Sequence, residues 1–63
     1  MTNTQESLMK YHIYYQRQHG DWQKYTTKHN EADAFRVMQR KANADGKRYK
    51  LVSDDGRLID LIG

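Results

Sequence analysis

The stretch YHIYYQRQHGDWQKY, from Tyr11 to Tyr25, contains five of the seven aromatic residues of this 63-residue chain. Between residues 9 and 16 the side chains alternate between a mostly apolar or aromatic set and a mostly polar set. This period of two, with aromatic and β-branched residues, is typical of a strand that buries one face. Gly20 interrupts the alternation and residues 22–27 resume it. The stretch therefore predicts a β-hairpin.

The glycine also indicates the length of the turn. A loop formed by residues 18–20, Gln-His-Gly, puts the glycine third, at a position where the backbone takes the left-handed conformation of a bulge. This loop predicts that Ile13 pairs with Tyr25 and that Tyr15 pairs with Gln23.

The segment NEADAFRVMQRKANADG, residues 30–46, predicts a helix. Asn30 is the expected N-cap, and Gly46 is expected to end the helix in the left-handed conformation. At about 100° per residue, one side of the helix carries an apolar stripe. The residues of this stripe are Ala34, Phe35, Met38 and Ala42.

A second hairpin is predicted within KRYKLVSDDGRLIDLI, residues 47–62. A two-residue loop would place Leu51 opposite Asp60 and would mix apolar and charged residues on both faces. A three-residue loop, Asp54-Asp55-Gly56, separates an apolar face from a charge-paired one, and we therefore expect it. Its predicted pairs are Leu51 with Ile59, Tyr49 with Leu61, and Lys50 with Asp60.

Together these elements predict an α+β fold of order ββαββ, a four-stranded antiparallel sheet with one helix packed on one face. Residues 8–63 are expected to form this single small domain, and residues 1–7 a disordered leader. The strand order stays open, because the two hairpins can also pair across a dimer interface to complete a larger sheet.

The predicted registers divide the sheet into a core face and an open face. The expected core consists of Tyr11, Ile13, Tyr25, Phe35, Met38, Tyr49, Leu51, Ile59 and Leu61. The opposite face has no predicted cover. It is expected to present His12, Tyr14, Trp22, Lys24 and Lys50, with Val52 and Leu58 nearby.

The composition predicts a thin core. Only 37% of the residues are hydrophobic while 30% are charged, and a chain of this length is near the lower limit for folding alone. Burial of a second face against a partner would add stability, which favours self-association as a homo-oligomer. There is no cysteine and no run of about 20 apolar residues, so we expect a cytoplasmic protein without a membrane span.

Motifs for catalysis are not evident. The three histidines lack the spacing of a metal site, and Asp-Asp-Gly is ordinary turn chemistry. We therefore expect no catalytic residues, no metal, no cofactor and no small-molecule substrate.

Two functions compete for the open face. The first is protein binding, including self-association as a homodimer, because exposed aromatic patches mark protein interfaces. The second is weak binding of RNA or single-stranded nucleic acid, in which bases stack on Tyr14 and Trp22 while cations hold phosphates. The net charge of +3 is weaker than the basic footprint of most nucleic-acid binders, which favours protein contacts.

The order of these motifs resembles that of short bacterial or phage proteins. The shared pattern is a tyrosine-rich strand, Gly-x-Trp at residues 20–22, an AxAF helix at residues 32–35, and YxLVxDDGRL at residues 49–58. This resemblance implies a common structural pattern and carries no activity, cofactor or site residue.

Overall fold

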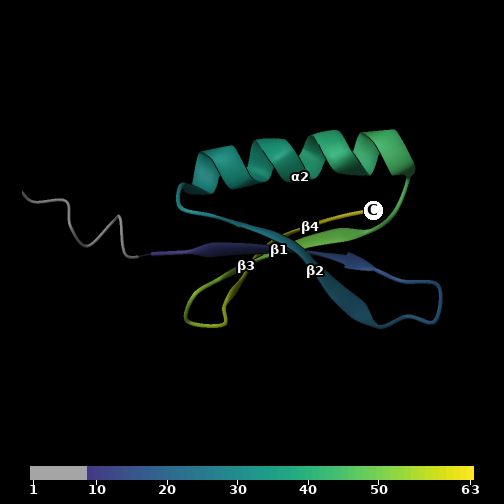
Figure 1. Cartoon of the computed structure of the whole chain (residues 1–63), viewed down its shortest axis with the longest axis horizontal. Helices are drawn as coiled ribbons and strands as arrows, with labels where there is room; N and C mark the ends of the chain where they lie inside the picture. Colours follow the sequence, from purple (N-terminus) through teal and green to yellow (C-terminus); the bar gives the residue numbers. More distant parts are fainter. Residues whose placement is uncertain (1–8) are drawn as a thin grey trace, which may run out of the picture.

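The computed structural model describes residues 9–63, and the predicted leader lies outside this range. Four antiparallel strands and one helix follow each other in the order ββαββ, with the helix on one face of the sheet (Figure 1). The predicted fold class is confirmed. The elements are β1 (Tyr11–Gln16), β2 (Trp22–Lys28), α2 (Glu31–Asp45), β3 (Tyr49–Ser53) and β4 (Leu58–Ile62).

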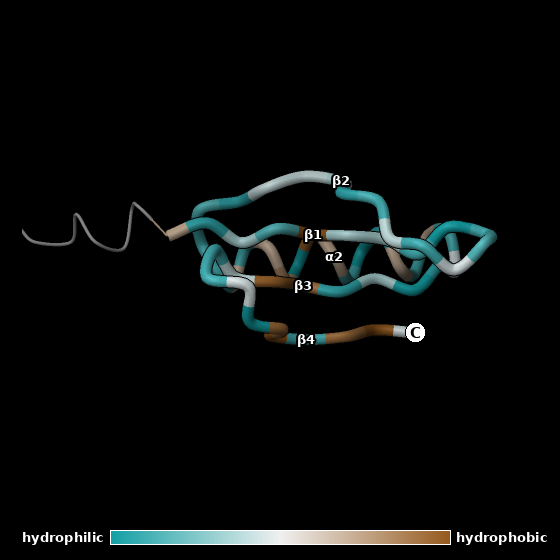
Figure 2. Tube along the Cα trace, turned by 90° about the horizontal axis from the view of Figure 1, so that it is seen from below, coloured by the Kyte–Doolittle hydropathy of each residue, from teal (hydrophilic) through white to brown (hydrophobic). Residues whose placement is uncertain are grey.

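The strand order, which the sequence left open, is β2-β1-β3-β4. The two hairpins join through β1 and β3, where Ile13 lies opposite Leu51 and Tyr15 opposite Tyr49. The buried residues of β1 and β3 are thereby neighbours beneath the helix. Figure 2, seen from below the sheet, shows hydrophilic β2 at one edge and hydrophobic β4 at the other.

Both predicted three-residue loops are confirmed. In the first, the Arg17 N–H donates to the Asp21 carbonyl at 2.8 Å, and Gly20 has a φ of 94°. In the second, the Ser53 N–H donates to the Arg57 carbonyl at 2.9 Å, and Gly56 has a φ of 87°. At such positive φ values glycine avoids the steric cost that a Cβ would bring.

The predicted register of the second hairpin is wrong beyond the loop. A β-bulge between Leu51 and Val52 shifts the pairing, so Leu51 lies opposite Asp60 and Lys50 opposite Leu61. A bulge places two residues of one strand against one of the other, which reverses the side of every later residue. Leu61 therefore lies on the open face, where it is 44% exposed, and Ile62 lies opposite Tyr49 in its place.

The first hairpin also contains a bulge. The pair of Tyr15 with Gln23 is confirmed, but Ile13 pairs with Thr26 because the register shifts between Ile13 and Tyr14. Tyr25 still lies on the helix side, with its ring centroid 6.5 Å from that of Tyr49. Its predicted burial is wrong, because at 43% exposure it borders the core instead of filling it.

The buried core is small, as the composition predicts. It contains Ile13, Ala34, Met38, Ala42, Tyr49 and Leu51, and the residues packed partly against it include Tyr11, Phe35, Ile59 and Ile62. The main contacts of α2 with the sheet are to β1, β2 and β3. The edge strand β4 consequently receives little cover from the helix.

Both predicted helix ends are confirmed. The Asn30 side chain accepts a hydrogen bond from the Asp33 N–H at 2.9 Å. At the other end, Gly46 has a φ of 71°, in the left-handed region, and its N–H donates to the Ala42 carbonyl. These contacts satisfy backbone groups that a helix end leaves without partners. Within residues 9–63, no helix has the length and apolar character required to cross a bilayer.

Candidate interaction surface

The candidate surface is the sheet face turned away from α2, which faces the viewer in Figure 2. Ile13 and Leu51 point to the helix and are fully buried, so alternation along β1 and β3 turns their sequence neighbours the other way. All five predicted contact residues, His12, Tyr14, Trp22, Lys24 and Lys50, share this face.

Four of these residues form a compact group, which we call the cation–ring cluster: Tyr14, Trp22, Lys24 and Lys50. Tyr14 on the central strand lies opposite both lysines. The Lys50 ammonium is 4.5 Å from the centroid of the Trp22 ring and 5.5 Å from that of Tyr14. One cation thus contacts two rings on neighbouring strands, an arrangement that only the strand order β2-β1-β3 produces.

The fifth residue, His12, has a different role. Its Nδ1 lies 3.1 Å from the Thr27 hydroxyl and its Nε2 lies 3.1 Å from the Asp54 carboxylate. The side chain is only 16% exposed. Both ring nitrogens therefore have partners within the protein, and His12 connects β2 and the loop at residues 54–56 through β1.

Beside the cation–ring cluster lies an apolar patch that consists of Val52, Leu58 and Leu61. Leu58 pairs with Val52, and Leu61 lies opposite Lys50 on the same face. The two leucines are 55% and 44% exposed. The sequence suggested Val52 and Leu58 near this face but not Leu61, because the bulge that turns Leu61 outward has no clear sequence signal.

The two edges of the sheet are poorly suited to pairing with another strand. On β4, the Leu61 N–H already donates to the Asp60 carboxylate at 2.8 Å. On β2, a bulge and the lysines Lys24 and Lys28 interrupt a regular edge. Natural proteins use charges and bulges in this way to protect edge strands.

Charge is distributed unevenly along the molecule. The first hairpin tip, the end of α2 and the start of β3 lie together, because the Gln16 N–H donates to the Arg48 carbonyl at 2.9 Å (Figure 1). We call this part the basic end. Its cations are Arg17, Lys24, Arg40, Lys41, Lys47, Arg48 and Lys50, against the carboxylates Asp21 and Asp45. Toward the opposite end the charges are nearly balanced, with the carboxylates Glu31, Asp33, Asp54 and Asp55 against the cations Lys10, Lys28, Arg36 and Arg57.

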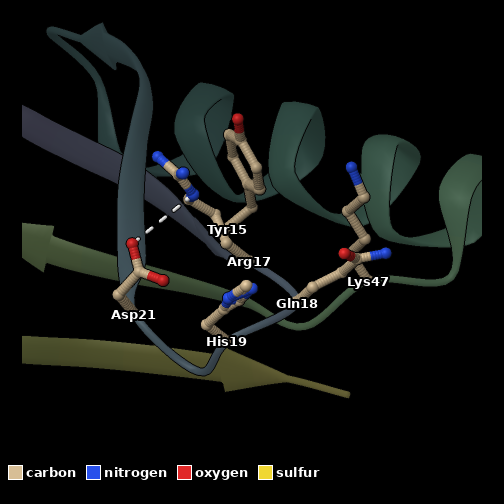
Figure 3. Close-up of a pocket in the computed structure, with 6 residues that line it drawn as sticks. All are labelled: Tyr15, Arg17, Gln18, His19, Asp21 and Lys47. Atoms are coloured by element: carbon tan, nitrogen blue, oxygen red, sulfur yellow. Dashed lines mark ion pairs between the residues drawn. The ribbon is translucent and has the colours of Figure 1, made fainter.

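A shallow groove at the basic end lies on the helix side of the sheet. Figure 3 shows Tyr15, Arg17 and Lys47 around it, with the Arg17 Nε 3.4 Å from the Asp21 carboxylate. The Lys47 ammonium is 4.9 Å from the Tyr15 ring centroid. Gln18 and His19 complete the rim. The groove is exposed, and its arginine is already paired with Asp21. It therefore contributes positive charge to the basic end but is not a preformed binding site.

Two carboxylates have lowered pKa values for structural reasons. The hydroxyl of Tyr49 donates to Asp45 at 2.6 Å, which lowers the pKa of Asp45. Burial of Tyr49, together with the same hydrogen bond, raises the pKa of Tyr49 well above its ordinary value. In the second loop the Ser53 hydroxyl donates to Asp55 and lowers the pKa of that carboxyl. These contacts fasten a helix end and a turn.

Across residues 9–63, no three side chains of histidine, aspartate or glutamate gather closely enough to hold a metal ion. His12 lies on β1, His19 at a hairpin tip and His29 before α2.

A search of family models, of curated proteins and of solved structures returned no match to the chain.

Proposed function

We propose that this protein acts through protein contacts and not by catalysis, and that its partner on the apolar patch is a second copy of the same chain. The observation that carries this proposal is the pair of exposed leucines, Leu58 and Leu61, on a sheet face that no element within residues 9–63 covers. Complete burial of a leucine contributes about 1.5–3 kcal/mol. Each of these leucines already has about half of its surface buried, so complete burial of both stabilises the dimer by about 2 kcal/mol per copy. Contacts of the neighbouring rings supply the remaining free energy of association.

The charge pattern supports a second copy in particular. On the open face the lysines of the cation–ring cluster lie on one side of the apolar patch, and Asp54 lies on the other. In a two-fold dimer each copy presents the same surface to its partner. An antiparallel arrangement of two open faces then brings the lysines of one copy near Asp54 of the other.

Contact through the face is favoured over contact through an edge. An added strand at β4 would have to displace the Asp60 carboxylate from the Leu61 N–H. Contact through the face leaves this hydrogen bond intact. With so few apolar side chains, the dimer is expected to dissociate in the micromolar range. A reducing compartment suits a chain without cysteine, and we propose that the protein works in the cytoplasm.

Sedimentation equilibrium tests this proposal. The wild-type mass should rise from monomer toward dimer as the concentration increases through the micromolar range. Leu58→Lys should keep the protein monomeric, because it places a charge in the contact. Gln39→Lys adds the same charge on the exposed side of α2 and should behave as wild type.

Circular dichroism will show whether each variant is folded, and Leu61→Gln provides a second, uncharged disruption of the patch. A wild-type protein that stays monomeric at every concentration contradicts the proposal. A folded Leu58→Lys variant that dimerises as well as wild type contradicts it equally.

A further inference from the structure

We propose that the cation–ring cluster binds single-stranded nucleic acid, with a base stacked on Trp22 and phosphates on Lys24 and Lys50. This inference goes beyond self-association. Because the cluster adjoins the apolar patch on the same face, nucleic acid and a second copy of the chain are expected to compete for it. It rests on the contacts of Lys50, on the charges of the basic end, and on the half-buried rings of Tyr14 and Trp22 beside them.

The cations at the basic end outnumber the carboxylates that could neutralise them. Asp21 is paired with Arg17, and Asp45 accepts hydrogen bonds from the Tyr49 hydroxyl and the Lys47 N–H. In the described part of the chain, neither lysine of the cluster forms an ion pair. The fold therefore concentrates positive charge that is evenly spread in the sequence, and an anionic partner gains most from meeting this end.

Lys50 occupies the position that a base would take. Its ammonium lies over the Trp22 ring at 4.5 Å and beside Tyr14. A cation–ring contact between half-buried side chains contributes about 2- to 30-fold to an equilibrium, whereas a base stacked on an aromatic side chain contributes about 5- to 150-fold. A base can consequently replace the ammonium on the ring. The displaced ammonium then remains close enough to meet the phosphate of the same nucleotide.

This geometry favours nucleic acid over an acidic peptide, because the rings lie among the cations on one face. A peptide of acidic residues would use the lysines but would gain nothing from stacking. A single strand is favoured over a duplex, since the bases of a duplex are already stacked on one another and only unpaired bases can lie on a protein ring.

Fluorescence titration of Trp22, the single tryptophan, tests the proposal directly. Twelve-nucleotide oligo(dT) and oligo(U) are added at low salt, below the protein concentration at which self-association occurs. We expect quenching that saturates and an affinity that falls as salt rises. A plot of log K against the logarithm of the salt concentration should have a slope of about −0.7 for each phosphate contact. Oligo(dU), which differs from oligo(U) only in lacking the ribose 2′-hydroxyl, shows whether that hydroxyl contributes.

Variants separate stacking from charge, with binding followed by the anisotropy of a labelled oligonucleotide. Trp22→Ala should weaken binding by about 5- to 150-fold, and Lys50→Gln should weaken it and lower the salt slope by about 0.7. Arg57→Gln removes an exposed cation at the loop end of the second hairpin, far from the cluster, and should leave binding unchanged.

The absence of quenching at high oligonucleotide concentration overturns the proposal. So does binding that is insensitive to Trp22→Ala, or binding of polyglutamate with equal affinity, which would indicate an acidic protein as the partner. Leu61→Gln is titrated as well, because it disrupts the apolar patch without adding charge. If this variant binds the oligonucleotide while its mass stays that of a monomer, nucleic-acid binding does not depend on self-association, and each proposal can fail without the other.

Discussion

At the scale of single residues, the contact between Tyr49 and Asp45 has the clearest consequence for stability. Tyr49 is 1% exposed, and its hydroxyl reaches the last residue of α2. A buried hydroxyl without a partner is costly, so this bond both satisfies the tyrosine and fastens the helix to β3. Because the bond is to a titratable group, its contribution depends on pH.

The pH dependence has a definite sign at each end. The pKa of Asp45 is lower in the folded protein, so its contribution is present above the unfolded value near 3.9 and is lost as pH falls through the folded pKa. The pKa of Tyr49 is higher in the folded protein, so its contribution is present below about pH 10 and is lost as pH rises through the folded pKa.

Tyr49→Phe should therefore be less stable than wild type at neutral pH, and the difference should shrink in acid below pH 4 and in alkali above pH 10. Urea unfolding at a series of pH values measures this. Tyr14→Phe is the control, because its hydroxyl lies on the open face, and it should keep the wild-type pH profile. Parallel curves for Tyr49→Phe and wild type would show that the bond is energetically silent.

At the scale of elements, the helix depends on its ends more than on its length. Its apolar stripe is narrow, and only Ala34, Met38 and Ala42 of the helix are buried. Helices in water gain most of their stability from such packing, so a narrow stripe leaves more of the stability to the caps. The N-cap formed by Asn30 is therefore expected to matter.

Asn30→Ala should lower the free energy of unfolding by about 1 kcal/mol, because the Asp33 N–H loses its acceptor. Asn43→Ala is the matched control. It makes the same change at an exposed position inside the helix, where alanine is the better helix former, and it should be neutral or slightly stabilising. Equal losses for both variants would argue against a special role of the cap.

The strands show how far local sequence determines an element. Alternation and glycine placement predict the hairpins and both loops, because these depend on residues within one turn of each other. The bulges at Tyr25 and in β4 are different. Each bulge adds one residue to a strand, because packing against the helix and the neighbouring strand favours the shifted register. The local sequence does not indicate this preference.

At the scale of the whole molecule, a thin core and an exposed apolar patch connect stability to association. The core contains six hydrophobic residues that are buried, a small number even for a short domain. If the folded chains bind one another and the unfolded chains do not, association stabilises the fold by mass action.

The melting temperature should accordingly rise by about 3–5 °C for each tenfold increase in protein concentration above the dissociation constant of the dimer. Leu58→Lys should melt at a temperature that does not depend on concentration. Differential scanning fluorimetry or calorimetry over two decades of concentration measures both. A concentration-independent wild-type melting temperature would separate folding from association.

The sequence by itself determined the order ββαββ, the helix with its caps at Asn30 and Gly46, both glycine loops, and the shared face of the five candidate contact residues. The helix, its caps and both loops follow from interactions between residues close together in the chain, and the shared face follows from the alternation of side chains along each strand. Only the tertiary structure decided the strand order, the outward position of Leu61, the bonded state of His12 and the gathering of cations at one end. These features depend on which strands pair. The pairing of β1 with β3 is favoured because it buries Ile13, Leu51 and Tyr49 beneath one helix. Such burial involves segments far apart in the chain, so no short stretch of sequence predicts it.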